Sequence, residues 1–138
     1  MRIGLVRCSK QKLGRACAGR DLYTASPLFR KARAYCERHY GAWYILSARY
    51  GLLHPDTVVA PYDLTLKGMP TAQRRAWAQR VSEQLRQLGP HTFFAHAGRE
   101  YLEHLSGVMV VNLLEGRTVG QRLCWYNEQA AREGWTCR

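Results

Sequence analysis

The side chains best suited to chemistry lie in two short segments near the amino terminus. Residues 7–12 follow the first apolar run, and residues 22–29 lead into the first clear helix. In an α/β protein, the carboxyl end of a strand and the amino end of the next helix lie at the same edge of the sheet. We therefore expect one crevice lined by Cys8, Ser9, Lys12, Tyr23 and Ser26.

The turns after the later strands offer further polar groups to the same edge. The expected substrate-binding residues from these turns and from the long central loop are Ser47, Tyr50, Asp63, Gly98 and Gly116. Glu115 follows an apolar strand and precedes a glycine that would let a ligand approach the backbone. Its carboxylate could bind ribose hydroxyls, stabilise a cationic sugar transition state, or pair with Arg117 instead.

Cys8, Lys12 and Glu115 are the expected catalytic residues, and each has a structural alternative. Cations near Cys8 favour a reactive thiol, but the position is better explained by a small buried thiol that packs under the loop. Lys12 could anchor a phosphate, act as a nucleophilic amine, or remain a solvated surface lysine. Ser26 could cap the helix, whose first amides could also bind a phosphate.

The apolar pattern predicts the elements that position these groups. Strands are expected at residues 3–6, 43–47, 92–95 and 108–113, and helices at 26–41, 71–88, 98–105 and 120–131. Strands and helices therefore alternate. This order predicts a single α/β domain over residues 1–138, Rossmann-like, with a mainly parallel sheet of four or five strands and helices on both faces.

Composition narrows the classes of partner. Lys and Arg total 21 against 10 Asp and Glu, a net charge of +11, which favours phosphate-bearing partners, although it could serve solubility alone. The five cysteines show no paired spacing, and the five histidines show no metal pattern. We expect a cytoplasmic protein with reduced thiols, no membrane segment, no metal and no cofactor.

Several motifs together resemble those of a widespread family of small bacterial and phage domains, often left as domains of unknown function. The matching segments are Cys8-Ser9-x-x-Lys12, Leu22-Tyr23-x-x-Ser26-Pro27-Leu28-Phe29, Ile45-Leu46-Ser47-Ala48-x-Tyr50-Gly51-Leu52, Pro61-Tyr62-Asp63-x-Thr65-Leu66 and Gly116-x-x-x-Gly120-x-Arg122.

Four of these residues are also distantly similar to the core domain of archaeosine synthase. Cys8, Lys12, Tyr23 and Ser26 match its pattern, whereas Phe29 stands where histidine is expected, and residues 13–22 form an insertion. The resemblance implies a crevice for a modified nucleobase, nucleoside or nucleic acid.

These observations predict an enzyme that acts on a nucleobase, a nucleoside or nucleotide, or a modified base of a nucleic acid. The reaction would be cleavage or transfer at an N-glycosidic bond, or attack on a base substituent. One alternative is a non-catalytic module that binds a nucleotide or nucleic acid. Another is an accessory protein of stress response or phage defence.

Overall fold

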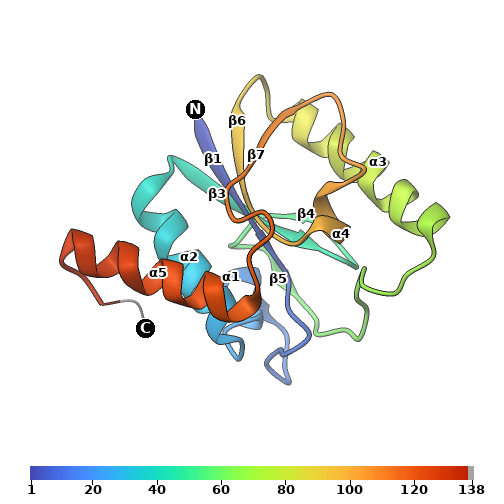
Figure 1. Cartoon of the computed structure of the whole chain (residues 1–138). Helices are drawn as coiled ribbons and strands as arrows, with labels where there is room; N and C mark the ends of the chain where they lie inside the picture. The colour runs from blue at the N-terminus through green and yellow to red at the C-terminus, as the bar shows by residue number, and fades with distance from the viewer. Residues whose placement is uncertain (137–138) are drawn as a thin grey trace.

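The computed structural model describes residues 1–136 and contains a five-stranded sheet in the order β4-β3-β1-β6-β7 (Figure 1). The strands are β1 (Arg2–Arg7), β3 (Ala42–Ser47), β4 (Gly51–Leu53), β6 (Thr92–His96) and β7 (Met109–Asn112). Strands β3, β1, β6 and β7 run parallel, and β4 pairs antiparallel with β3. The mixed α/β class and the mainly parallel sheet are therefore confirmed.

The helices are α1 (Gly19–Leu22), α2 (Pro27–His39), α3 (Thr71–Gln87), α4 (Arg99–Leu102) and α5 (Val119–Glu133). In Figure 1, α2 and α5 lie on one side of the sheet, and α3 lies on the other. Both faces of β1 are thereby covered, which explains why Ile3 to Val6 form a continuous buried run.

Helix α2 packs so closely on β1 that the strand requires a glycine. A Cβ at Gly4 would lie 2.6 Å from Cδ2 of Tyr40 and 2.8 Å from Sγ of Cys36. Glycine is the only residue without this atom, so Gly4 sets the distance between α2 and the central strand.

Local capping explains where α2 and α5 begin. The Ser26 hydroxyl accepts a hydrogen bond from the Phe29 amide, and Pro27 occupies the first helical position. Thr118 and Gln121 form a reciprocal capping box at the start of α5. Both helix starts lie at the carboxyl edge of the sheet, where they can contribute to a site.

The sequence analysis did not predict the shortest strands. β2 (Cys17–Ala18) pairs antiparallel with β5 (Val58–Val59), and the edge strand β4 begins at Gly51, whose φ is 71°. The helix expected at residues 98–105 is shorter, because α4 ends at Leu102. Such short segments carry too few residues to show a period.

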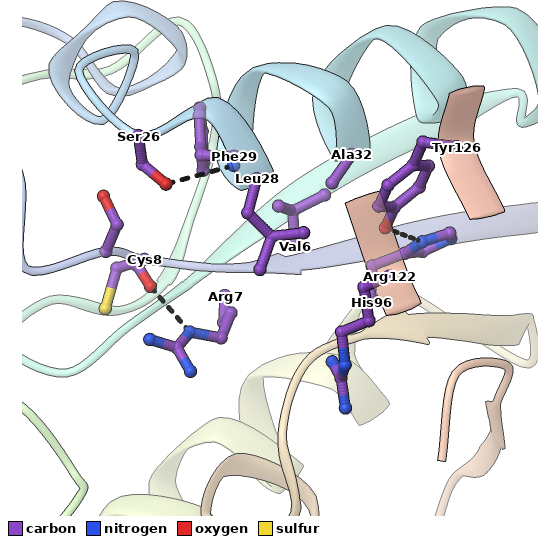
Figure 2. Close-up of a pocket in the computed structure, with 11 residues that line it drawn as sticks. Val6, Arg7, Cys8, Ser26, Leu28, Phe29, Ala32, His96, Arg122 and Tyr126 are labelled. Carbon is purple, nitrogen blue, oxygen red and sulfur yellow. Dashed lines mark hydrogen bonds between the residues drawn. The ribbon is translucent and has the colours of Figure 1, made fainter. Parts of the chain in front are cut away.

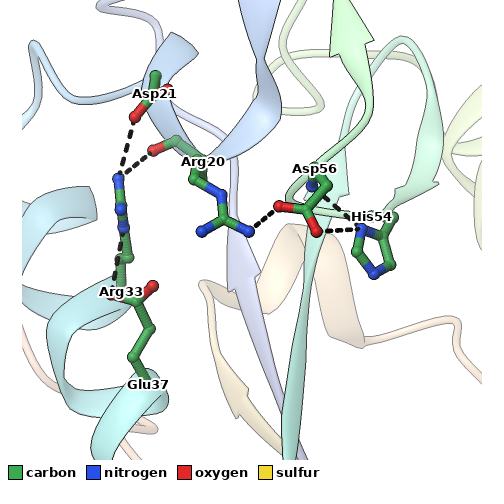
Figure 3. A network of polar contacts seen from close by, with 6 residues as sticks. All are labelled: Arg20, Asp21, Arg33, Glu37, His54 and Asp56. Atoms are coloured by element: carbon green, nitrogen blue, oxygen red, sulfur yellow. Dashed lines mark hydrogen bonds and ion pairs between the residues drawn. The ribbon is translucent and has the colours of Figure 1, made fainter.

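A surface network of charged groups anchors the segment that carries Tyr23 (Figure 3). Arg33 of α2 donates to the backbone carbonyl of Arg20 at 2.8 Å and lies 3.3 Å from the Asp21 carboxylate. Arg20 in turn pairs with Asp56, which follows β4. The network ties α1 to α2 and to the loop between β4 and β5.

None of the helices in residues 1–136 combines the length and apolar composition that crossing a membrane requires. In the same residues, no group of His, Cys, Asp and Glu has the arrangement of a metal site. The thiols described are free, at Cys8, Cys17, Cys36 and Cys124; Cys137 lies outside the described residues.

Candidate functional site

Five segments of the chain bring polar side chains together at the carboxyl ends of β1 and β3. We call this group the thiol–phenol cluster, and its members are Cys8, Lys12, Tyr23, Ser47, Tyr62 and Tyr101. Cys8 extends β1, Ser47 ends β3, Tyr101 comes from α4, and Tyr62 comes from the loop after β5. The parallel sheet positions the first two, because its carboxyl ends share one edge.

The Cys8 thiol lies among several polar groups. Its Sγ accepts a hydrogen bond from the Ala48 amide at 3.4 Å and lies 3.3 Å from the Tyr101 hydroxyl. The residue is only 2% exposed. Cys8 is therefore buried, and these two contacts hold its thiol in a fixed direction.

The Tyr62 hydroxyl connects two other members of the cluster. It lies 2.8 Å from the Tyr23 hydroxyl and 2.9 Å from Oγ of Ser47. Ser47 also accepts a hydrogen bond from the Tyr50 amide, and the Tyr50 hydroxyl donates to the Ala60 carbonyl. These bonds satisfy buried hydroxyls and hold the loop after β5 against the end of β3.

Burial keeps the phenols protonated. It raises the pKa of Tyr23 to about 12, against an ordinary value of 10.0, and it raises the pKa of Tyr62 and Tyr101 further. At neutral pH the three hydroxyls are therefore neutral hydrogen-bonding groups.

Lys12 lies against the aromatic part of the cluster. Its Nζ is 4.4 Å from the centre of the Tyr62 ring and donates to the Lys10 carbonyl at 3.2 Å. Burial lowers its pKa, while the nearby charges of Cys8 and Asp63 act in the opposite direction. A partly desolvated amine beside a thiol is a suitable arrangement for a nucleophile or a proton donor.

A small pocket lies next to the cluster, at the carboxyl ends of β1 and β6, and we call it the switch-point pocket (Figure 2). The chain adds β3 on one side of β1 and β6 on the other, so the strand order reverses here. Arg7, Cys8, Ser9, Ser26, His96, Arg122 and several apolar side chains line it. Its interior space is about 30 Å³, enough for about two water molecules.

His96 forms the deep polar wall of this pocket. Its Nδ1 lies 2.7 Å from the Tyr126 hydroxyl, and its Nε2 lies 2.9 Å from the Tyr40 hydroxyl. Burial lowers the pKa of His96 to about 3, and the positive charges of Arg122 and His39 act in the same direction. The imidazole is therefore neutral at physiological pH and orients Tyr126 by hydrogen bonding.

The structure brings most of the expected site residues to one edge. The cluster contains Cys8, Lys12, Tyr23 and Ser47. The Tyr50 amide donates a hydrogen bond to Ser47, and the charge of Asp63 opposes the lowering of the Lys12 pKa. Ser9 and Ser26 line the adjacent pocket. Gly98 caps the start of α4. Glu115, however, is exposed and lines a separate open groove with Arg99 and Asn112, and the neighbouring Gly116 lies in an exposed turn.

The predicted site residues did not include Tyr62 and Tyr101 of the cluster, or Arg7, His96 and Arg122 of the pocket. Tyr62 and Arg122 stand inside motifs quoted above, which was a usable signal. Tyr101 gave none, because it meets Cys8 across 93 positions of the chain.

Together, these features define a mixed α/β protein with a cluster of polar side chains and a small pocket at the carboxyl edge of its sheet. Comparison with models of protein families assigns the chain to one family. It belongs to the family described as "Family of unknown function (DUF6884)", whose model matches residues 3–128. A search of curated proteins found no match, and a search of solved structures also found none.

Proposed function

We propose that this protein is a Rossmann-like enzyme that acts on a nucleobase, a nucleoside or nucleotide, or a modified base of a nucleic acid. The observation that carries the proposal is the thiol–phenol cluster. A thiol, an amine and three neutral phenols from segments far apart in sequence meet where α/β sheets bind ligands.

The surroundings of the cluster support a planar, hydrogen-bonding substrate. The Tyr62 ring lies edge-on to Tyr50 and beneath the Lys12 ammonium, so aromatic surface and donors occur side by side. The net charge of +11 favours a ligand that carries phosphate. The resemblance of Cys8, Lys12, Tyr23 and Ser26 to the archaeosine synthase core suggests a modified base among the candidates.

The geometry favours attack on a base substituent over cleavage of a glycosidic bond. Glu115, the carboxylate suited to a cationic sugar transition state, lies in another groove. In the proposed step, Lys12 accepts the proton of the Cys8 thiol, and the sulfur adds to the carbon of a carbon–nitrogen multiple bond in the base or its substituent, whose π bond breaks. Lys12 then returns this proton to the nitrogen of that bond, directly or through a phenol of the cluster, so that the sum is the addition of the thiol across the bond.

A panel of nucleosides, nucleotides, modified bases and oligonucleotides, analysed by mass spectrometry for products, tests the proposal. We expect Cys8→Ser and Lys12→Met each to lower turnover by about 100-fold or more, the usual contribution of a nucleophile or general acid. Lys10→Met is the matched control, since Lys10 is exposed in the same loop. Full activity in both cluster variants would refute the assignment of Cys8 and Lys12.

The second candidate is a module that binds a nucleotide or nucleic acid without catalysis. Exposed Arg75 and Arg80 on α3, with Arg49 beside Arg80, favour it. This candidate predicts an affinity that falls steeply with salt, and no product from any member of the panel.

A further inference from the structure

The switch-point pocket contains two guanidinium groups and little negative charge to balance them. Arg7 approaches one carboxylate, that of Glu100, at a rather long 3.7 Å. Arg122 forms no ion pair with a carboxylate in residues 1–136; its Nε donates to the backbone carbonyl of Arg117 at 3.1 Å. In Figure 2 the guanidinium groups of Arg7 and Arg122 lie on the same side of Val6.

This arrangement is electrostatically unfavourable without an anion. Burial lowers the pKa of Arg122, and the positive charge of Arg7 adds to this effect, while Tyr126 and Glu100 oppose it. Two partly buried like charges repel each other, and a bound anion would remove the repulsion.

The amino end of α2 supplies backbone donors to the same pocket. Leu28 and Phe29 line it and stand in the first turn, where amides have no partner within the helix. The Phe29 amide bonds to Ser26, which leaves the Leu28 amide and the positive end of the helix dipole for a ligand.

We propose that Arg7, Arg122 and the amino end of α2 form a subsite for a phosphate group. The pocket holds about 30 Å³ of space, which suits the terminal oxygens of a phosphate and excludes a whole base. Guanidinium groups match phosphate oxygens in a bidentate geometry. That this phosphate belongs to the substrate rests on the function proposed above; binding of the anion itself does not.

Titration of the labelled wild-type protein with inorganic phosphate, followed by nuclear magnetic resonance, tests the subsite directly. We expect the amide signals of Leu28 and Phe29 and the Nε–H signal of Arg122 to shift together along one saturating curve. Shifts confined to other regions, such as the exposed arginines of α3, would overturn the proposal, as would the absence of saturable shifts.

A matched pair of variants on α5 gives a second measurement. Arg122→Met should weaken phosphate binding by about tenfold or more, the usual value of a hydrogen bond to a charged group. Arg132→Met removes the same charge from an exposed position on the same helix and should change the affinity by less than about twofold. Equal losses in the two variants would show that only net charge matters and would overturn the subsite.

The source of the phosphate is decided with nucleoside monophosphates and a single-stranded oligonucleotide as probes. If Arg122→Met weakens only the oligonucleotide, the phosphate is that of a nucleic-acid backbone; if it weakens both, a free nucleotide is sufficient. If it weakens neither, the proposal is wrong. Phosphate affinity and turnover are separate measurements. A wild-type protein that binds phosphate but turns over no substrate would therefore refute the proposed enzymatic activity and leave the phosphate subsite standing.

Discussion

Replacing Tyr62 with phenylalanine removes the hydroxyl that connects the thiol–phenol cluster. The hydroxyl lies 2.8 Å from that of Tyr23 and 2.9 Å from Oγ of Ser47. Tyr23 and Ser47 are both fully buried, so water cannot replace the lost partner without rearrangement. Two hydrogen bonds at about 1 kcal/mol each, with a buried hydroxyl left unsatisfied, predict a loss of about 2–3 kcal/mol in the free energy of unfolding.

Urea denaturation of the wild type and Tyr62→Phe measures this loss. For a chain of this length, the expected change corresponds to a decrease of roughly 4–10 °C in Tm. Tyr44→Phe is a matched control, because the Tyr44 hydroxyl forms no hydrogen bond in residues 1–136, and it should change stability by less than about 0.5 kcal/mol. A Tyr62→Phe protein as stable as the control would refute the hydrogen-bonding role of Tyr62.

A double-mutant cycle with Tyr23→Phe separates the shared bond from other effects. The double variant should be more stable than the sum of the single losses implies, by about 1 kcal/mol.

The raised pKa of Tyr23 also predicts that stability depends on pH. Its pKa is about 12 when folded, against 10.0 ordinarily, so the folded state retains a proton that the unfolded chain releases. Stability should therefore fall as pH rises from about 10 to 12, and less steeply in Tyr23→Phe.

Two further perturbations test the packing around the site. Gly4→Ala should destabilise the protein by about 1–3 kcal/mol in urea denaturation, because the new Cβ would overlap Tyr40 and Cys36. Gly14→Ala is the control, because open space surrounds Gly14, and it should change stability little. The pKa of His96 is about 3 in the folded protein against 6.5 ordinarily, so its contribution to stability is complete above about pH 6.5 and should be lost as pH falls toward 3. Urea denaturation at a series of pH values measures this loss. If the free energy of unfolding falls as steeply with acid in His96→Gln as in the wild type, the assignment is wrong.

The parallel strands and the long helices were predictable from local pattern alone. Residues 3–6 form a short apolar run with polar residues after it, and Ser26-Pro27 is a helix start that depends only on adjacent groups. The position of Cys8 and Lys12 at the sheet edge followed, because it requires only that a strand end there.

Contacts between distant segments were not predictable. Tyr101 meets Cys8 because α4 folds back over the end of β1, and nothing in residues 98–105 encodes that direction. The side chain of Glu115 depends on the turn after β7, whose path from strand to helix the sequence period does not specify. Side-chain direction in loops is determined by tertiary packing, which explains why the cluster was only partly anticipated.

The central claim is that a base-containing ligand binds at the carboxyl edge of the sheet, against the thiol–phenol cluster. A crystal structure of the protein soaked with nucleotides and modified bases tests it most directly. The account predicts density for a planar ring beside Lys12 and Tyr62, with a phosphate between Arg7 and Arg122. Density in the groove of Arg99 and Glu115, or over the exposed arginines of α3, would contradict it.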